Sequence, residues 1–185
     1  MDKLNKLKEC AFAFNKLLNK EYYIKAVRKD KIIEVRLFFE KEHFYHLLGL
    51  HKLRDIEQLK INSVKLFDNI LNEKITYKDI SSSRFFDDIS DRIEYLPYLE
   101  QILDDEKTII KYNKSRCKSS IDAKYILYGK INGLNVHYFI DIDEKKQKYF
   151  GRTFFARQDY IYLQDSPYKI LEKIVIFKTS EVNNS

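Results

Sequence analysis

The sequence contains few of the residues that usually form loops, cofactor-binding motifs and disulfide frameworks. Its 185 residues include 4 glycines, 2 prolines and 2 cysteines, and tryptophan is absent. Scarce glycine and proline argue against disordered linkers. The glycines stand alone and match no phosphate-binding loop or dinucleotide fingerprint. Cys10 and Cys117 form neither a disulfide framework nor a metal knuckle, so the sequence gives no sign of a nucleotide cofactor or a disulfide-stabilised domain.

The sequence also lacks a signal peptide and any run of about 18 apolar residues, which a membrane-spanning helix would need. We therefore expect a soluble protein of the cytoplasm with no membrane partner. Hydrophobic residues make up 44% of the chain, which is enough for a substantial core. Since no repeat or linker interrupts the pattern, we expect a single domain over residues 1–185, helix-rich in 1–105 and with a basic antiparallel sheet in 106–180.

The net charge of +6 is unevenly distributed along the chain. Residues 1–105 hold 19 basic and 19 acidic side chains, whereas residues 106–185 hold 15 basic and 9 acidic ones. Between residues 107 and 130, seven lysines and arginines face only one acid, Asp122. This asymmetry is expected of a polyanion-binding face backed by a helical scaffold. The alternative is that the basic loops merely keep the fold solvated.

Residues 1–105 are dominated by the three- and four-residue spacing of apolar side chains that is typical of amphipathic helices. Gly49 is expected to cap the end of the second helix, and Val64 to lie on the buried face of the third. Residues 21–28 and 31–39 instead predict a hairpin with a polar turn between them. The helices are expected over residues 2–19, 42–48 and 58–73, after Thr76, after Ser82 or Ser83, and over 99–103.

After Asp105 the helical spacing gives way to alternation of apolar and polar residues, which is typical of strands. The pair Asn132 and Gly133 is a strong signal for a two-residue hairpin turn. The predicted fold class is therefore α+β, with a helical N-terminal part packed on a mainly antiparallel C-terminal sheet. The strands are expected over residues 108–112, 123–130, 134–141, 148–155 and 168–178.

Three of the four histidines gather between residues 38 and 56, in a segment with a glycine and a cationic end. Imidazole titrates near neutral pH, so this cluster indicates proton transfer or phosphate contact, and a satisfied surface helix is the alternative. His43 and His46 share a helix face. The segment lacks the acidic motif of known zinc helices, so no metal or other cofactor is expected. His137, on a predicted strand, is expected to be packed or paired with an aspartate.

Four segments together resemble the PBECR group of phage and mobile-element proteins, whose name denotes barnase–EndoU–colicin–RelE-like nucleases, and in particular its fourth subgroup. They are ECAFAFNKLL, FYHLLGLHKLRDI, ITYKDISSSRFFDDISDRIEYLPYLEQILDD and YFGRTFF, in this order over about residues 7–175. The most specific part is the His-Leu-x-Gly core that begins at His46. In YFGRTFF, Gly151 stands where a variable small residue is expected. The resemblance implies a compact BECR-like fold of helices and antiparallel sheet, and metal-independent cleavage of RNA.

Cleaving RNA without a metal ion requires a base for the 2′-hydroxyl, an acid for the departing 5′-oxygen and cations for the phosphate. His46 anchors the family-like motif and is expected to act as acid or base. His51 follows the predicted helix end and is expected in a loop that can contact phosphate. Arg152 lies between Phe150 and Phe154 on an otherwise apolar strand face, so its charge must find an internal carboxylate or a phosphate. Because arginines on the sheet hold the scissile phosphate in small endonucleases of this shape, Arg152 completes the predicted catalytic set.

Further cations are expected to bind the RNA backbone. For the strand residues Lys124 and Lys173 the alternative is a solvated face. Arg84 and Arg92 stand among aspartates, so local ion pairs explain them. The predicted binding residues are Lys52, Lys114, Arg116, Lys118, Lys124, Arg157 and Lys173.

With the resemblance, these residues predict an endoribonuclease of phage or mobile-element origin that acts as a toxin or host-takeover factor. The alternative is a non-catalytic protein that binds RNA or a host ribonucleoprotein and inhibits a host defence complex, since phosphate contacts alone can supply affinity. RNA is the expected partner in both cases. The position of the histidine segment relative to the basic sheet distinguishes them.

Overall fold

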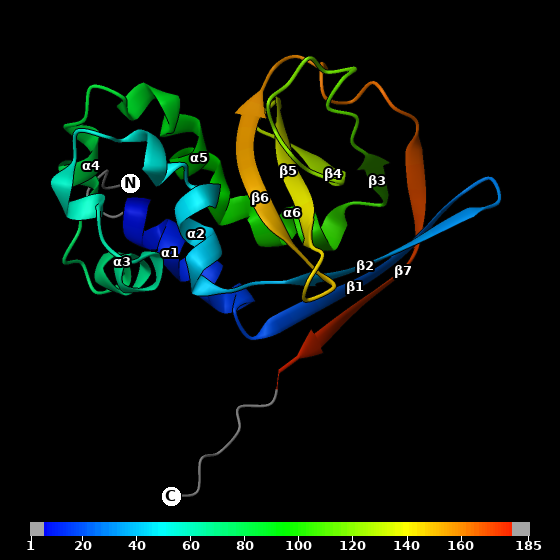
Figure 1. Ribbon diagram of the computed structural model, residues 1–185, viewed down its shortest axis with the longest axis horizontal. Helices are drawn as coiled ribbons and strands as arrows, with labels where there is room; N and C mark the ends of the chain where they lie inside the picture. Colours follow the sequence, from blue (N-terminus) through cyan, green and yellow to red (C-terminus); the bar gives the residue numbers. More distant parts are fainter. Residues whose placement is uncertain (1–5, 179–185) are drawn as a thin grey trace, which may run out of the picture.

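The computed structural model describes residues 6–178, in which a group of short helices lies beside a closed β-barrel (Figure 1). Every helix among these residues is too short or too polar to cross a bilayer. The α-helices are α1 (Lys6–Leu17), α2 (Lys41–Leu47), α3 (Ser63–Leu71), α4 (Tyr77–Ser81), α5 (Ser90–Tyr95) and α6 (Leu99–Asp105). The 3₁₀ turns are η2 (Leu50–Lys52), η3 (Glu57–Leu59), η4 (Phe86–Asp88) and η5 (Leu96–Tyr98). The strands are β1 (Lys20–Arg28), β2 (Lys31–Phe38), β3 (Thr108–Lys111), β4 (Tyr125–Ile131), β5 (Leu134–Asp143), β6 (Lys148–Arg157) and β7 (Pro167–Phe177).

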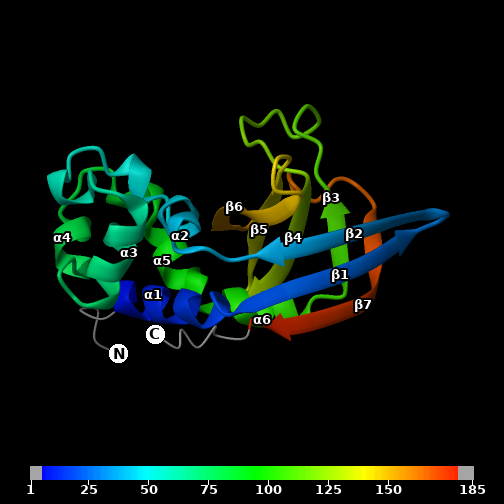
Figure 2. The ribbon, with the colours of Figure 1, turned by 60° about the horizontal axis from the view of Figure 1, so that its bottom comes forward.

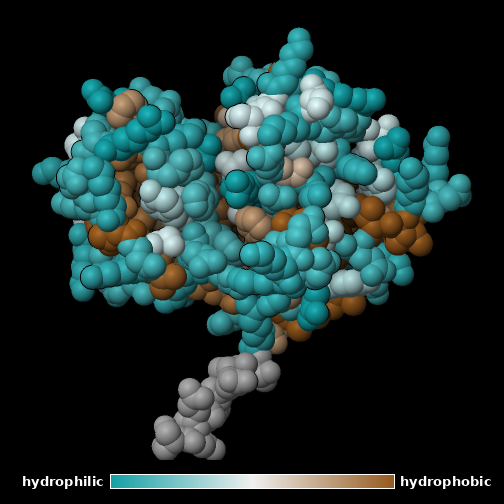
Figure 3. Space-filling view, in the orientation of Figure 1, coloured by the Kyte–Doolittle hydropathy of each residue, from teal (hydrophilic) through white to brown (hydrophobic). Residues whose placement is uncertain are grey.

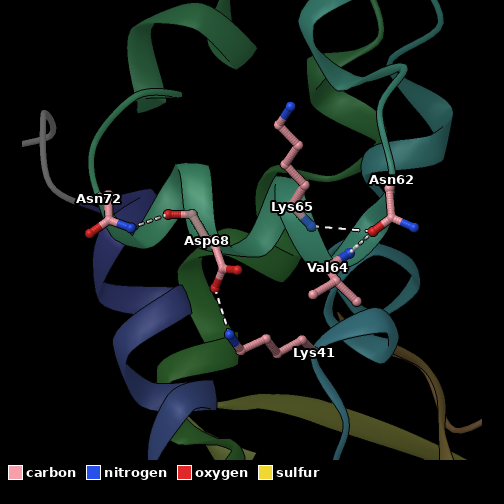
Figure 4. Close-up of polar contacts among 6 residues, drawn as sticks. All are labelled: Lys41, Asn62, Val64, Lys65, Asp68 and Asn72. Carbon is pink, nitrogen blue, oxygen red and sulfur yellow. Dashed lines mark hydrogen bonds and ion pairs between the residues drawn. The ribbon is translucent and has the colours of Figure 1, made fainter.

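The helix α3 is built by a local cap and fixed to α2 by an ion pair (Figure 4). The side chain of Asn62 accepts hydrogen bonds from the backbone N–H groups of Val64 and Lys65, which would otherwise have no partner at the helix start. Lys41, the first residue of α2, donates to Asp68 on α3 at 2.7 Å. The expected burial of Val64 is wrong, because this side chain is 38% exposed. The cap begins the helix at residue 63 rather than 58 and turns Val64 toward solvent.

The other predicted helices agree with the structure where local signals are strong. The helix expected over 2–19 is confirmed as α1, although its first residues lie outside the part of the chain that the structure describes. Thr76 and Asp79 form the capping box of α4, in which Thr76 Oγ1 and N–H both donate to the carboxylate. The helix expected after Ser83 is instead divided into η4 and α5, because the Ser83 hydroxyl donates to Asp55 at 2.5 Å and caps no α-helix.

Within residues 6–178, seven strands close a mixed barrel in the order β1-β2-β6-β5-β4-β3-β7. The α+β class is confirmed, but the predicted C-terminal antiparallel sheet is only part of the arrangement. The N-terminal hairpin β1–β2 extends away from the helices (Figure 2) and closes the barrel by pairing with β7 and, in parallel, with β6. The parallel joint is short, with Leu37 beside Tyr149 and Phe38 beside Phe150.

A main core runs from the helices into the barrel, and a smaller apolar cluster lies against β4, β5 and β6. The main core joins Phe14 of α1 and Phe44 of α2 to Tyr138 of β5. The smaller cluster holds Ile126 and Phe139 of the sheet, which are covered by the segment between β3 and β4. Because this basic segment, residues 112–124, packs on the apolar cluster, it is held at the end of the barrel that borders the helical group.

Candidate functional site

A cleft with a volume of about 800 Å³ lies between the helical group and the barrel. Its walls come from α2 and η2, from η4 and α5, from β6, and from the loop that precedes β4. In the space-filling view the surface is indented between these two parts of the molecule (Figure 3). The titratable and charged side chains along the cleft are His46, His51, Lys52, Asp87, Asp88, Asp91, Arg92, Lys118, Asp122, Arg152 and Arg157.

The end of α2 brings two histidines side by side on one wall of the cleft. His46 lies in the last turn of α2, and the chain leaves the helix through Gly49, whose φ of 73° is left-handed and strained for any other residue. A Cβ atom at Gly49 would also lie 3.0 Å from both Ile89 and Arg92. The turn η2 then places His51 so that its ring centroid is 5.2 Å from that of His46. The predicted glycine cap is confirmed.

Both cleft imidazoles have a lowered pKa, although both side chains are exposed on the cleft wall. The pKa of His46 is lowered first by loss of water and then by the charge of Arg152. That of His51 is lowered first by loss of water and then by His46 and the nearby cations Arg92 and Lys52. Both rings are therefore neutral at pH 7, a state in which imidazole can accept a proton but must be protonated before it donates one.

Arg152 reaches the cleft because β6 contains a bulge. Phe139 of β5 pairs with Thr153 and the next residue, Ile140, pairs with Gly151, so Arg152 is the extra residue on β6. A bulge redirects a side chain, and Arg152 is exposed on the cleft wall. The expectation that it shares a face with Phe154 is wrong, because Phe154 is fully buried in the main core.

The sequence did not identify Arg92 as part of the site. Its Nη1 donates to the backbone carbonyls of His46 at 3.4 Å and Leu47 at 3.3 Å, and to the hydroxyl of Thr153 at 3.1 Å. Only 6% of Arg92 is exposed. The expected local ion pairs are not formed, since no carboxylate among residues 6–178 lies within 4.0 Å of its guanidinium nitrogens. The sequence did contain a signal that Arg92 is buried, because it stands three residues after Ile89 and therefore on the apolar side of α5.

The rim formed by η4 and α5, on the helical side of the cleft, is acidic. Asp91 accepts a hydrogen bond from the backbone N–H of Ala156 at 2.8 Å, which ties α5 to β6. The backbone carbonyl of Asp88 accepts from Lys52 Nζ at 3.2 Å. The rim therefore holds the two walls at a fixed separation and orients Lys52. Its carboxylates belong to Asp87, Asp88 and Asp91, whereas Asp122 lies in the loop before β4 on the other rim.

Aromatic side chains form part of the cleft lining on the barrel side. Phe155 and Tyr162 line it, and the guanidinium of Arg157 lies over their rings at 5.4 and 5.7 Å. His137 packs beneath them with its ring centroid 5.7 Å from each. His137 is fully buried and packed, which was one of the two alternatives predicted from the sequence. Its ring nitrogens have no hydrogen-bond partner among the described residues. Burial lowers the pKa of His137 to about 4.

The predicted RNA-binding cations divide into two groups. Three of them, Lys52, Lys118 and Arg157, line the same cleft as the predicted catalytic residues. The others lie outside it and have partners of their own. Lys114 pairs with Asp122 at 2.6 Å, Arg116 with Asp165, and Lys124 with Glu144 at 3.4 Å.

Lys173 has a structural position. Its ammonium group donates to the backbone carbonyls of Leu103 and Asp104 in the last turn of α6 and of Glu106 directly after it. Cations near a helix C-terminus satisfy the carbonyls that lack helical partners. The structure therefore uses Lys173 to attach β7 to α6, at a distance from the cleft lining.

One group of side chains could hold a metal ion, and it lies outside the main cleft. Donor atoms of Glu40, Glu42 and His43 converge within 4.8 Å. Two of these residues also have other partners, because the backbone N–H of Glu40 donates to His43 Nδ1 at 3.2 Å and the carboxylate of Glu40 lies 3.7 Å from Lys146. Within residues 6–178, the cleft histidines and aspartates form no comparable group.

The family comparison covers nearly the whole chain. The family model described as phage-Barnase-EndoU-ColicinE5/D-RelE like nuclease4, PBECR4, matches residues 6–185. The chain therefore belongs to the PBECR4 nuclease family. Neither the comparison with curated proteins nor that with solved structures gives a match.

Proposed function

We propose that this nuclease-family protein is a metal-independent endoribonuclease of phage or mobile-element origin, acting in the cytoplasm as a toxin or host-takeover factor. One observation carries the proposal. His46 of α2, His51 of η2 and Arg152 of β6 line one cleft. Family membership supports a nucleic acid as substrate. The choice of RNA rests on the paired imidazoles, since RNA supplies its own nucleophile in the 2′-hydroxyl.

The chemistry follows from these groups. One neutral imidazole accepts the proton of the 2′-hydroxyl, whose oxygen attacks the adjacent phosphorus. The P–O5′ bond breaks, the 5′-oxygen takes a proton from the second imidazole, and the products carry a 2′,3′-cyclic phosphate and a 5′-hydroxyl. Arg152 lies where its charge can stabilise the extra negative charge of the phosphate in the transition state. A bound phosphate raises the pKa of the second imidazole, which is how a ring that is neutral in the free protein becomes an acid.

The test is incubation of the purified protein with structured and unstructured RNA, including tRNA, in the presence of EDTA. Fragments should end in 2′,3′-cyclic phosphate, and His46→Ala should slow cleavage by about 10²–10⁴-fold with the fold intact. Arg152→Ala should weaken both cleavage and binding, because its charge serves the bound and transition states alike. Lys65→Ala, an exposed cation on α3, is the matched control and should leave the rate unchanged. Intact RNA with every substrate would contradict the proposal.

A second candidate function is stoichiometric capture of RNA or of a host ribonucleoprotein, which would inhibit a host defence complex. The lowered pKa values of His46 and His51 favour it, because neither ring is in the imidazolium form that a general acid needs at pH 7 in the free protein. The five cations of the cleft, Lys52, Arg92, Lys118, Arg152 and Arg157, would then serve binding alone. If the doubly substituted His46→Ala, His51→Ala protein binds RNA and keeps its full biological effect, capture is the function.

A further inference from the structure

The strands β1, β2 and β7 present one exposed face on the outside of the barrel. Residues that pair across these strands lie on the same face of the sheet, and the buried face carries Tyr22 and Ile24. The opposite face carries Tyr23 of β1, which pairs with Ile174 of β7. Ile174 and Ile176 are each 44% exposed on this face. In the space-filling view, apolar surface gathers along β7 (Figure 3).

These apolar side chains form a surface on which a partner can pack. Neighbouring large apolar side chains that stay exposed on a folded chain mark an interaction surface. Their exposure shows that no helix within residues 6–178 covers them. Because the described strands form a closed barrel, they offer no free edge to which a partner could add a strand. A partner must therefore bind to the face itself.

Charges of opposite sign lie beside the apolar side chains on this face. Arg36 of β2 lies in the row of Ile174, two strands away, and its side chain is 61% exposed. The ammonium of Lys178 and the guanidinium of Arg36 both lie over the Phe38 ring. Glu172 of β7 is exposed, lies two residues from Ile174, and makes no ion pair among the described residues. The face therefore carries a cationic site on β2 and an available carboxylate on β7.

The cationic site and the carboxylate lie equally far from the centre of the apolar side chains, in perpendicular directions. Neighbouring strands are about 4.8 Å apart, so Arg36 lies about 10 Å across the strands from the two isoleucines. The rise along a strand is about 3.4 Å per residue, so Glu172 lies about 10 Å along β7 from the midpoint of Ile174 and Ile176. A two-fold axis that runs diagonally across the strands exchanges these two directions. It places Glu172 of one copy over Arg36 of the other and packs the isoleucines of the two copies together.

We propose that this face binds the same face of a second copy of the protein, with the two sheets crossing at nearly right angles. Orthogonal packing is one of the two arrangements that stacked sheets adopt, and a two-fold interface closes at two copies. The face supplies both members of each ion pair, whereas RNA is disfavoured because Glu34 and Glu172 would repel its phosphates. No residue of these three described strands lines the main cleft, so both clefts of the dimer stay open. The inference does not depend on the proposed function.

Sedimentation equilibrium of the purified protein over a range of concentrations tests the dimer. The protein should sediment as a dimer, and Ile174→Asp should be a monomer at the same concentrations because its carboxylates would be buried at the centre. Ile61→Asp is the matched control, since Ile61 is a 37% exposed isoleucine just before α3, outside the face, and should stay dimeric. Thermal unfolding confirms that each variant is folded. A protein that is monomeric at every concentration, or a dimer that survives Ile174→Asp, overturns the proposal.

Charge reversal tests which side chains meet in the dimer. Glu172→Arg and Arg36→Glu should each weaken dimerisation by about tenfold or more, because like charges then face each other at both contacts. Mixed in equal amounts, the two variants should regain the dimer, since the mixed pair restores opposite charges. If Arg36→Glu does not fold because the buried Glu21 loses its partner, Lys178→Glu takes its place. A mixture that stays monomeric overturns the crossed arrangement, and a monomer that binds a different protein through Ile174 overturns the second copy as the partner.

Discussion

At the scale of single residues, Arg92 joins both walls of the cleft through one guanidinium group. Its hydrogen bond to Leu47 satisfies a carbonyl at the end of α2 that lacks a helical partner, and a second bond goes to His46, whose carbonyl also accepts from the backbone N–H of Gly49. The third reaches Thr153, which is adjacent to Arg152 on β6. The bond to the Leu47 carbonyl is buried, so water cannot readily replace it. Arg92 is therefore a positioning residue that sets the spacing of His46 and Arg152.

Substitution of Arg92 should affect catalysis more than RNA affinity. Arg92→Ala leaves the buried carbonyl of Leu47 without this donor, so the free energy of unfolding should fall by about 1–3 kcal/mol. The single-turnover cleavage rate should fall by about tenfold or more because the catalytic groups are misplaced. Arg92→Lys keeps the charge but loses the planar fork, and should recover only part of both losses. Urea unfolding and single-turnover kinetics at saturating RNA measure these effects.

Arg84 provides the matched control for Arg92. It is an exposed arginine on the neighbouring turn and lies 4.7 Å over the ring of Phe85, outside the cleft lining. Arg84→Ala should change neither stability nor rate appreciably. If Arg92→Ala instead weakens RNA binding strongly at an unchanged saturated rate, Arg92 contacts phosphate directly and the positioning role is wrong.

At the scale of elements, the bulge in β6 depends on the glycine that precedes Arg152. The ring of Tyr138 lies directly beneath Gly151, and a Cβ atom there would be 2.6 Å from Cε2 and 2.8 Å from Cζ of that ring. In this chain the position therefore has no room for a side chain. Tyr138 is fully buried in the main core, so it cannot move aside without cost.

Gly151→Ala should therefore both destabilise the barrel and displace Arg152. Overpacking of this kind costs about 1–3 kcal/mol in the free energy of unfolding. RNA affinity should fall as well, because the bulge that aims Arg152 is distorted. In a Tyr138→Leu background the ring is gone, so the same change should cost less, and a double-mutant cycle in urea unfolding measures the coupling. Equal costs in the two backgrounds would show that the Tyr138 ring is not the obstacle.

The loop before β4 should supply affinity rather than catalysis. Lys118 lines the cleft, whereas the charge of Lys114 is compensated by Asp122 at 2.6 Å. Lys118→Ala should lower RNA affinity and reduce the slope of log K against log salt by about 0.7, the value for one contact to single-stranded phosphate. Lys114→Ala should change that slope less. Filter-binding titrations at several salt concentrations measure both, and a change in saturated cleavage rate for Lys118→Ala would contradict the assignment.

Element boundaries could be predicted from the sequence wherever the determining signal is local. The Thr76 capping box, the Gly49 helix end and the Asn132–Gly133 turn each lie within a few residues of the structure they determine. Closure of the barrel could not be predicted from the sequence, because it depends on pairing between β1 and β7, which are about 150 residues apart in the chain. The bulge at Arg152 could not be predicted either, because the strand register is set by pairing with β5 and is not visible in the local sequence pattern of β6.

At the scale of the whole molecule, the cleft exists because two charge-biased parts of the chain fold against each other. The acidic stretch around η4 and α5 forms one rim, and the basic loop before β4 with β6 forms the other. The sequence indicated that His46, His51 and Arg152 belong to one site, because residue type and motif mark them. It could not indicate Thr153, Phe155 or Tyr162, whose side chains are ordinary until the fold places them beside those residues.

The apolar cluster behind the cleft makes the stability of the whole protein dependent on pH. His137 has a folded-state pKa of about 4, compared with about 6.5 in the unfolded chain. As the pH falls from 6.5 toward 4, the unfolded chain binds a proton at this ring and the folded protein does not, so stability is lost on acidification. The limiting slope for one such group is about 1.4 kcal/mol per pH unit. His43, with a pKa also lowered to about 4, adds to the effect.

His137→Phe should remove one contributor to this slope. The substitution keeps the ring packed among Phe139, Phe155 and Tyr162, and removes two buried nitrogens that have no partner among the described residues. The variant should therefore be at least as stable as the parent at pH 7 and gain on it steadily toward pH 5, as measured by urea unfolding across that range. Tyr112→Phe is the matched control, because Tyr112 lies in the same cluster and its pKa is raised, so it should shift stability equally at every pH. If the free energy of unfolding of His137→Phe and of the parent fell in parallel as the pH is lowered, protonation of His137 would not be the cause of the acid destabilisation.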